Sequence, residues 1–335
     1  MRVLVALLAV LVVALAGSGA FVWSLDAGAA AAGQTPGELD FEVPRGATAR
    51  AVGVQLEKEG LVPSALVWRY TLWKRGGLQL KAGRFRLDRS MSPLALAAAL
   101  EKSPLAEDEP FSVLEGWRLR DTDEALAAAG RIAAGEYLKA ASSSAGYRAP
   151  FALPSGGLEG YLYPETYQLP KGRVDPRVLV QKQLDLFAAR MWTPNEAAVA
   201  AQKRTLHELV TMASMLEREE PTPANRPMVA GILWKRIDQG WPLGVDATSR
   251  YTLEKWNDRQ AFLVQLRDPK DPYNSRLRKG LPPTPIGAPT TVSFEASLQP
   301  TRSEYLYYLH DAQKVLRPSR NAEEHEALRK KYNVY

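Results

Sequence analysis

The residues of this sequence best suited to chemistry are Glu217, Glu219 and Glu220, which end an apolar stretch that begins at Leu209 and stops before Pro221. The apolar residues of the stretch have the spacing of a buried helical stripe. A carboxyl group that continues such a stripe is partly desolvated, so its pKa rises and it can remain protonated near neutral pH. Such a group can act as the general acid that cleavage of a glycosidic bond requires. A solvated acidic cluster at a helix end is the alternative, and this segment alone leaves both open.

The sequence lacks the residues of most other chemistries. It contains no cysteine and three histidines among 335 residues, which excludes a zinc site built from paired cysteines and argues against a metal site built from histidines. No glycine run matches a phosphate loop or a dinucleotide fingerprint. The net charge is +6, but no Lys/Arg-rich block with interleaved aromatic residues predicts nucleic-acid binding. We therefore expect no metal and no cofactor, and either carboxylate chemistry or none.

The first 25 residues predict a membrane anchor. No charged residue lies between Arg2 and Asp26, and an apolar helix over residues 3–25 would be roughly 35 Å long, enough to cross a ~30 Å hydrocarbon core. A cleaved signal peptide is the alternative, because residues 27–32 offer small-residue cleavage sites, but the apolar run is longer than a usual signal core. We expect a single-pass protein of the cytoplasmic membrane with its body on the extracytoplasmic side.

The rest of the chain divides into a spacer and two folded units, and the predicted fold class is α+β. Residues 26–38 are rich in Ala and Gly and predict a flexible linker. Residues 39–110 predict a small module with a strand, two helices and a returning strand. Residues 111–335 predict a larger α+β domain that carries the glutamate-bearing helix. Its other expected elements are helices at 174–191, 225–237, 293–297 and 321–332 and a strand at 305–309.

Residues 158–167 form an unusual segment, Leu-Glu-Gly-Tyr-Leu-Tyr-Pro-Glu-Thr-Tyr. Its three tyrosines and two glutamates, around a glycine and a proline, suit neither a helix nor a buried strand. Loops that gather aromatic rings and carboxylates often line carbohydrate or peptide sites, because ring faces pack on sugar C–H groups. A structural role is an equal alternative for this segment alone.

Five motifs, taken together and in this order, resemble the YceG-like family of endolytic murein transglycosylases. The motifs are Leu-Glu-Gly at 114–116, the segment at 158–167, the apolar-acidic helix at 209–219, Leu-x-x-Asp-x-Thr at 243–248, and Tyr-Asn-Ser at 273–275 followed by Gly-Leu-Pro-Pro-x-Pro-Ile at 280–286. Each motif is moderately specific, and the ordered set behind an apolar N-terminal segment is strongly specific.

The resemblance implies an activity and partners. Members of this family cleave the β-1,4 bond between N-acetylmuramic acid and N-acetylglucosamine in nascent peptidoglycan strands, and they form 1,6-anhydro-muramyl ends without consuming water. One glutamate can serve as both acid and base in this reaction, because the attacking hydroxyl belongs to the sugar itself. The resemblance also implies a LysM-like first module, peptidoglycan glycan strands as the substrate, and peptidoglycan synthases as partners.

The resemblance also assigns residues to the site. The family's catalytic glutamate corresponds to Glu219, and Glu217 becomes a supporting or alternative carboxylate. The residues expected to hydrogen-bond the acetamido and hydroxyl groups of the glycan are Asp246, Thr248, Tyr273 and Asn274. Those expected to shape the cleft wall, with a structural role as the alternative, are Glu159, Tyr163 and Glu165.

The chain departs from the family pattern near its end. Many relatives carry a Gly-x-His-x-Phe motif after the Tyr-Leu-Tyr strand, and residues 312–320 lack it. This departure supports an alternative function, in which a non-catalytic, membrane-anchored protein binds peptidoglycan or docks synthases.

Overall fold

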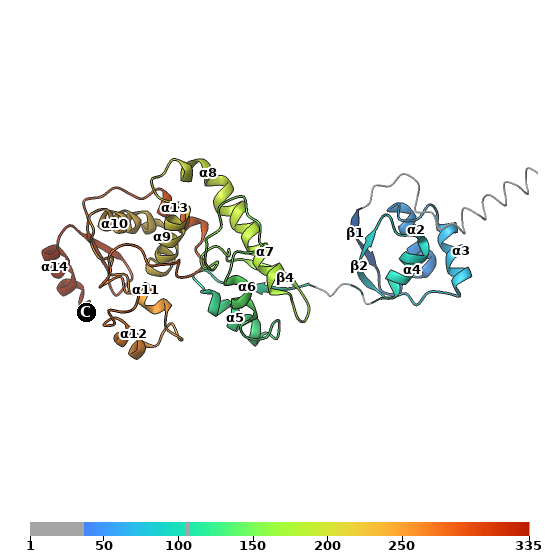
Figure 1. The fold of residues 1–335 in the computed structure, drawn as a ribbon, viewed down its shortest axis with the longest axis horizontal. Helices are drawn as coiled ribbons and strands as arrows, with labels where there is room; N and C mark the ends of the chain where they lie inside the picture. Colours follow the sequence, from blue (N-terminus) through green and yellow to red (C-terminus); the bar gives the residue numbers. More distant parts are fainter. Residues whose placement is uncertain (1–36, 103, 105–107, 335) are drawn as a thin grey trace, which may run out of the picture. The chain divides into compact units, whose positions relative to one another are not determined.

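The computed structural model describes residues 37–102, 104 and 108–334 (Figure 1). The predicted anchor at residues 1–25 and most of the predicted linker at 26–38 lie outside the described residues. In the described part of the chain, no helix has the length and apolar character needed to cross a membrane.

The fold is a mixed α+β structure, as predicted, and its strands form three separate two-stranded sheets: β1–β2, β3–β4 and β5–β6. Contacts divide the chain into two compact units, with the boundary between Asp108 and Glu109. Each unit has its own hydrophobic core.

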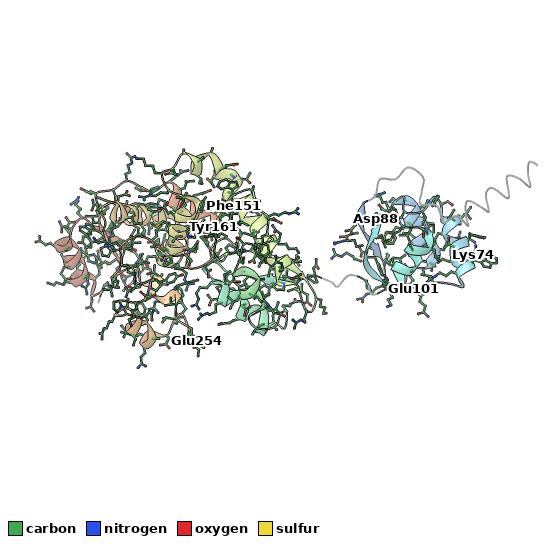
Figure 2. The ribbon with its side chains drawn as sticks, viewed as in Figure 1. Lys74, Asp88, Glu101, Phe151, Tyr161 and Glu254 are labelled. Atoms are coloured by element: carbon green, nitrogen blue, oxygen red, sulfur yellow. The ribbon has the colours of Figure 1, made fainter. Side chains whose placement is uncertain are left out.

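The first unit has the predicted order of a strand, two helices and a returning strand, with one further helix. Its elements are β1 (Glu38–Val43), α2 (Ala49–Lys58), α3 (Ala65–Arg75), β2 (Gly83–Asp88) and α4 (Pro93–Glu101). Strands β1 and β2 pair antiparallel, with Phe41 opposite Phe85. The Trp68 side chain is fully buried, and its indole N–H donates to the carbonyl of Ala49, which joins α3 to α2. Glu101, labelled in Figure 2, pairs with Arg75 at 2.6 Å.

The second unit is mostly helical. Its elements are β3 (Asp108–Ser112), α5 (Leu119–Ala128), α6 (Glu136–Ala141), β4 (Thr166–Pro170), α7 (Pro176–Phe187), a π-helical turn (Ala188–Trp192), α8 (Thr193–Ala200), α9 (Leu206–Glu219), a 3-10 turn (Pro223–Asn225), α10 (Arg226–Asp238), α11 (Asp246–Tyr251), α12 (Arg259–Gln265), α13 (Thr291–Leu298), β5 (Tyr307–His310), β6 (Leu316–Ser319) and α14 (Ala322–Tyr332). The helix predicted at 174–191 begins at Pro176, and its helical backbone continues beyond Phe187 as the π-helical turn to Trp192.

Helix α9 is the central element of the second unit. It begins at a capping box, in which the Thr205 hydroxyl accepts from the amide of Glu208 and the Glu208 carboxylate accepts from the amide of Thr205. All eight residues from Leu209 to Leu216 are buried, so the helix is covered on every side instead of along one stripe. Helices α10, α11 and α13 pack against it (Figure 1).

Three of the sequence motifs meet on α9. Gly160 of the segment at 158–167 has φ +81°, and a Cβ placed there would contact Pro285 and lie 3.1 Å from Val210 Cγ1 of α9. The amide of Ile286 donates to the Ser214 hydroxyl of α9 at 2.9 Å. Tyr161, the next residue after Gly160, stacks near Phe151 in the core (Figure 2). The turn at Gly160 and the proline-rich loop thus hold α9 from one side.

We expect Gly160→Ala to destabilise the second unit strongly, because it adds a clash with Pro285 to the left-handed backbone strain. Gly172→Ala is the matched control, since Gly172 has φ +88° and open space at its Cβ position. Overpacking costs about 1–3 kcal/mol, so the free energy of unfolding of Gly160→Ala should lie lower than that of Gly172→Ala by that amount. Urea denaturation of both variants measures the difference, and equal stabilities would contradict the tight approach at Gly160.

Candidate active site

Glu219 is the last residue of α9, and its carboxyl group lies among side chains from three other parts of the unit. Burial raises the pKa of Glu219 to about 7, and the nearby carboxylate of Asp246 on α11 contributes to the rise. His310, the Tyr308 hydroxyl and Arg276 act in the opposite direction. A carboxyl group with this pKa can donate a proton near neutral pH and take one back afterwards.

Glu217 occupies a different environment, although it lies only two residues away. Its carboxylate pairs with the Arg226 guanidinium at 3.0 Å and accepts from both the amide (2.8 Å) and the hydroxyl (2.6 Å) of Thr290. The side chain is 6% exposed. Because Thr290 is the N-cap of α13, Glu217 ties the end of α9 to α13 and to α10.

Glu220 follows the helix as its C-cap and is fully buried. Its carboxylate accepts from Nε2 of His310 at 2.8 Å and from the amide of Thr222 at 2.8 Å. The hydrogen bond from His310 is the main cause that lowers the pKa of Glu220, despite burial, and the same bond raises the pKa of His310. This contact therefore favours the carboxylate form of Glu220 and the protonated form of His310.

The three glutamates thus differ in their partners. Glu217 pairs with Arg226 and Glu220 pairs with His310, whereas Glu219 makes no ion pair within the described residues. The carboxyl group that makes no ion pair is the one whose pKa is raised. Sequence periodicity alone could not separate these neighbours.

Asp246 is the predicted glycan-binding residue that lies with Glu219. It is the first residue of α11, and its carboxylate accepts two hydrogen bonds from Arg276, at 2.6 Å from Nη2 and 2.9 Å from Nε. The Asp246 side chain is 42% exposed, so it remains accessible to a ligand. Its negative charge beside Glu219 favours the protonated form of Glu219.

Thr248 and Asn274 do not face a groove. Both side chains are fully buried. The Thr248 hydroxyl donates to the carbonyl of Val245 at 2.8 Å, and the Asn274 amide donates to the carbonyls of residues 265, 266 and 268. The expectation that they hydrogen-bond the glycan is corrected, because their polar groups hold the loops that carry Asp246 and Tyr273.

Glu159 belongs to a second cluster, with Tyr251 and Tyr273. Its buried carboxyl accepts from the amide of Leu119 and, at 3.1 Å, from the hydroxyl of Tyr251. Burial raises the pKa of Glu159 to about 7. The Tyr273 ring lies 4.7 Å from that of Tyr251, and its hydroxyl bonds the Thr284 hydroxyl.

The two remaining predicted wall residues lie apart from both clusters. The Tyr163 hydroxyl bonds the Thr291 hydroxyl at 3.0 Å, at the start of α13. Glu165 is exposed, and its carboxylate accepts from the amide of the next residue, Thr166. Neither side chain contacts Glu219.

Sequence reasoning missed Tyr308, His310 and Arg276 as neighbours of Glu219. Tyr308 and His310 alternate on β5, so they share one face of the strand, and this spacing was the available signal. Arg276 directly follows the Tyr-Asn-Ser motif. In the part of the chain that the structure describes, no three His, Asp or Glu side chains converge as metal ligands would.

Comparisons with known proteins place this geometry in a family. The model of the YceG-like family matches residues 41–331. The endolytic murein transglycosylase of Bacillus subtilis is 25% identical over 313 residues, which cover 88% of this chain and 84% of that protein. The protein of the same name from Streptococcus pneumoniae serotype 2 is 26% identical over 310 residues, or 80% of this chain and 53% of that one. The chain therefore spans about half the length of the pneumococcal relative.

A solved structure shares the fold. The crystal structure of a YceG-like protein from Listeria monocytogenes superposes with a TM-score of 0.57 at 23% identity, and the match covers 88% of this chain and all of that one.

The raised pKa of Glu219 predicts a pH-dependent effect on stability. A group whose pKa is about 7 when folded and 4.5 when unfolded stabilises the fold fully below pH 4.5, and this contribution is lost as the pH rises through 7. Glu219→Gln cannot ionise. The free energy of unfolding of Glu219→Gln minus that of the natural protein should therefore be about 1–3 kcal/mol larger at pH 8 than at pH 5.

Chemical denaturation at the two pH values measures this gain. Glu196→Gln, an exposed glutamate on α8, is the control and should show no pH-dependent difference. The same stability difference for Glu219→Gln at pH 5 and pH 8 would show that the Glu219 pKa is ordinary.

Proposed function

Since the chain belongs to the YceG-like family, we propose that it is an endolytic peptidoglycan lytic transglycosylase with Glu219 as its general acid and base. The substrate is the β-1,4 bond between N-acetylmuramic acid and N-acetylglucosamine in nascent glycan strands. The observation that carries the proposal is that Glu219 alone of three adjacent glutamates lacks an ion pair in the described structure and has a pKa of about 7.

The reaction needs two proton transfers at the same carboxyl group. Protonated Glu219 gives its proton to the glycosidic oxygen as the bond to the muramyl C1 breaks, and the N-acetylglucosamine hydroxyl leaves. The Glu219 carboxylate then removes the proton of the muramyl 6-hydroxyl as its oxygen bonds to C1, which closes the 1,6-anhydro ring and restores the acid. The half-exposed carboxylate of Asp246 accepts hydrogen bonds from acetamido or hydroxyl groups of the glycan.

The remaining parts of the proposal concern location and partners. Residues 3–25 anchor the protein in the cytoplasmic membrane with the body outside, and their apolar composition is the support. The first unit acts as a LysM-like glycan-binding module, and its strand–helix–helix–strand order supports this role. Peptidoglycan synthases are partners by resemblance to the family alone.

Mass spectrometry of glycan strands after incubation with the full chain tests the reaction. We expect new chain ends about 18 Da lighter than hydrolysis products, because ring closure replaces the attack of water. Glu219→Gln should lower the rate by about 10²–10⁴-fold, the usual contribution of a general acid, while Glu196→Gln keeps it. Hydrolysed ends would indicate a second active carboxylate. Binding of strands without cleavage by the natural protein would support a non-catalytic scaffold instead.

The pH dependence of the reaction gives a second test. Because the free enzyme must hold the Glu219 proton, kcat/KM should be high below pH 7 and fall tenfold per pH unit above it. Initial rates between pH 5 and pH 9 define this alkaline limb. A limb with its midpoint near 4.5 would mean that Glu219 is not desolvated in the working enzyme.

A further inference from the structure

The strand β5 contacts two consecutive carboxyl groups at the end of α9. Tyr308 and His310 lie on one face of β5, and their rings are 6.1 Å apart in an edge-on arrangement. The Tyr308 hydroxyl interacts with Glu219, and His310 bonds Glu220. The end of the helix is therefore held against the strand through two adjacent side-chain pairs.

The pair of His310 with Glu220 is well shielded from water. The His310 side chain is 22% exposed and the Glu220 side chain is fully buried. The second carboxylate oxygen of Glu220 accepts from the amide of Thr222, so the carboxylate is held in a fixed orientation. Removing one partner of an ion pair this buried strongly lowers the stability of the fold, because the other partner is left as an unpaired buried charge.

The charges that face Glu219 are few. Asp246 on α11 favours the protonated carboxyl, whereas Arg276, His310 and the Tyr308 hydroxyl favour the carboxylate. The Arg236 guanidinium on α10 also interacts with Glu219, and it donates to the carbonyls of residues 243 and 306. Arg276 is already neutralised by two hydrogen bonds to Asp246. The charges on the other side of His310 are Glu220, which pairs with it, and Asp311, which pairs with Arg317. Of the residues of β5, His310 is thus the one that can carry a positive charge near Glu219.

We propose that His310 is a positioning residue for the reaction: as an imidazolium held by Glu220, it keeps β5 and Tyr308 against Glu219 and favours the carboxylate that the second proton transfer requires. This inference rests on the proposed function of Glu219.

The hairpin formed by β5 and β6 fixes the position of His310. His310 lies opposite Leu316 in the antiparallel register of β5 and β6. The Asp311 carboxylate closes the connection by accepting from the amides of Gln313 and Val315 and pairing with Arg317 at 2.9 Å. Residues 312–320, which lack the family's histidine motif, form this turn and β6. In this chain the hairpin carries a histidine on β5 instead, at position 310.

The test compares His310→Gln with His325→Gln in the full chain. Glutamine keeps an N–H donor for Glu220 but cannot carry the positive charge. His325 on α14 stacks on Tyr307 at 5.3 Å and does not contact the carboxylates, so it is the matched control. For His310→Gln we expect the alkaline limb of kcat/KM to move up by about one pH unit, the size of a neighbouring-charge effect. We also expect kcat to fall by about 10- to 100-fold.

His325→Gln should change neither quantity. A folded His310→Gln protein with an unmoved alkaline limb would overturn the proposal, whether or not kcat falls, because a merely structural histidine does not move the proton affinity of Glu219.

Nuclear magnetic resonance gives a readout that needs no activity. The chain has three histidines, so their imidazole signals can be assigned by single substitutions. In the natural protein His310 should titrate above its ordinary pKa of 6.5, and in Glu220→Gln and Glu219→Gln the midpoint should move down. Titration at or below 6.5 in the natural protein would reject the pair. If no anhydro ends form while His310 titrates above 6.5, the proposed function and the role of His310 in the reaction are rejected, and the pair of His310 with Glu220 stands.

Discussion

The structure of the second unit depends on the burial of the central part of α9, from Leu209 to Leu216. These residues are buried on every face of the helix, and α10, α11, α13, the turn at Gly160 and the proline-rich loop cover them. The helix ends in three glutamates, so the same coverage that buries its apolar residues also desolvates its carboxyl groups. Packing and acid strength therefore have one cause.

The neighbouring elements place each of the three carboxyl groups in different surroundings. Arg226 pairs with Glu217, and the amide of Thr290 at the N-cap of α13 donates to it. His310 of the β5–β6 hairpin bonds Glu220. Glu217 and Glu220 thus link α9 to the elements around it. Glu219 has the like charge of Asp246 nearby and makes no ion pair in the described part of the chain. Glu217 and Glu220 thus fix the end of the helix on either side of Glu219.

The sequence predicted the glutamate helix because apolar periodicity and a following proline are local signals. It could not separate Glu217, Glu219 and Glu220, because their partners lie far along the chain: Thr290 is 73 residues from Glu217, and His310 is 90 residues from Glu220. Thr248 and Asn274 show a related limit. A hydroxyl or amide in a loop motif has the same sequence signature whether it faces a ligand or satisfies buried carbonyls.

The late position of β5 has a consequence for biosynthesis. A chain synthesised only as far as α13 has the whole of α9, yet it lacks the strand that pairs with Glu220 and contacts Glu219. Because chains are made from the N-terminus, the Glu219 carboxyl group is synthesised many residues before the strand that contacts it. Assembly of the site is therefore coupled to the synthesis of the β5–β6 hairpin, whose His310 follows Glu220 by 90 residues.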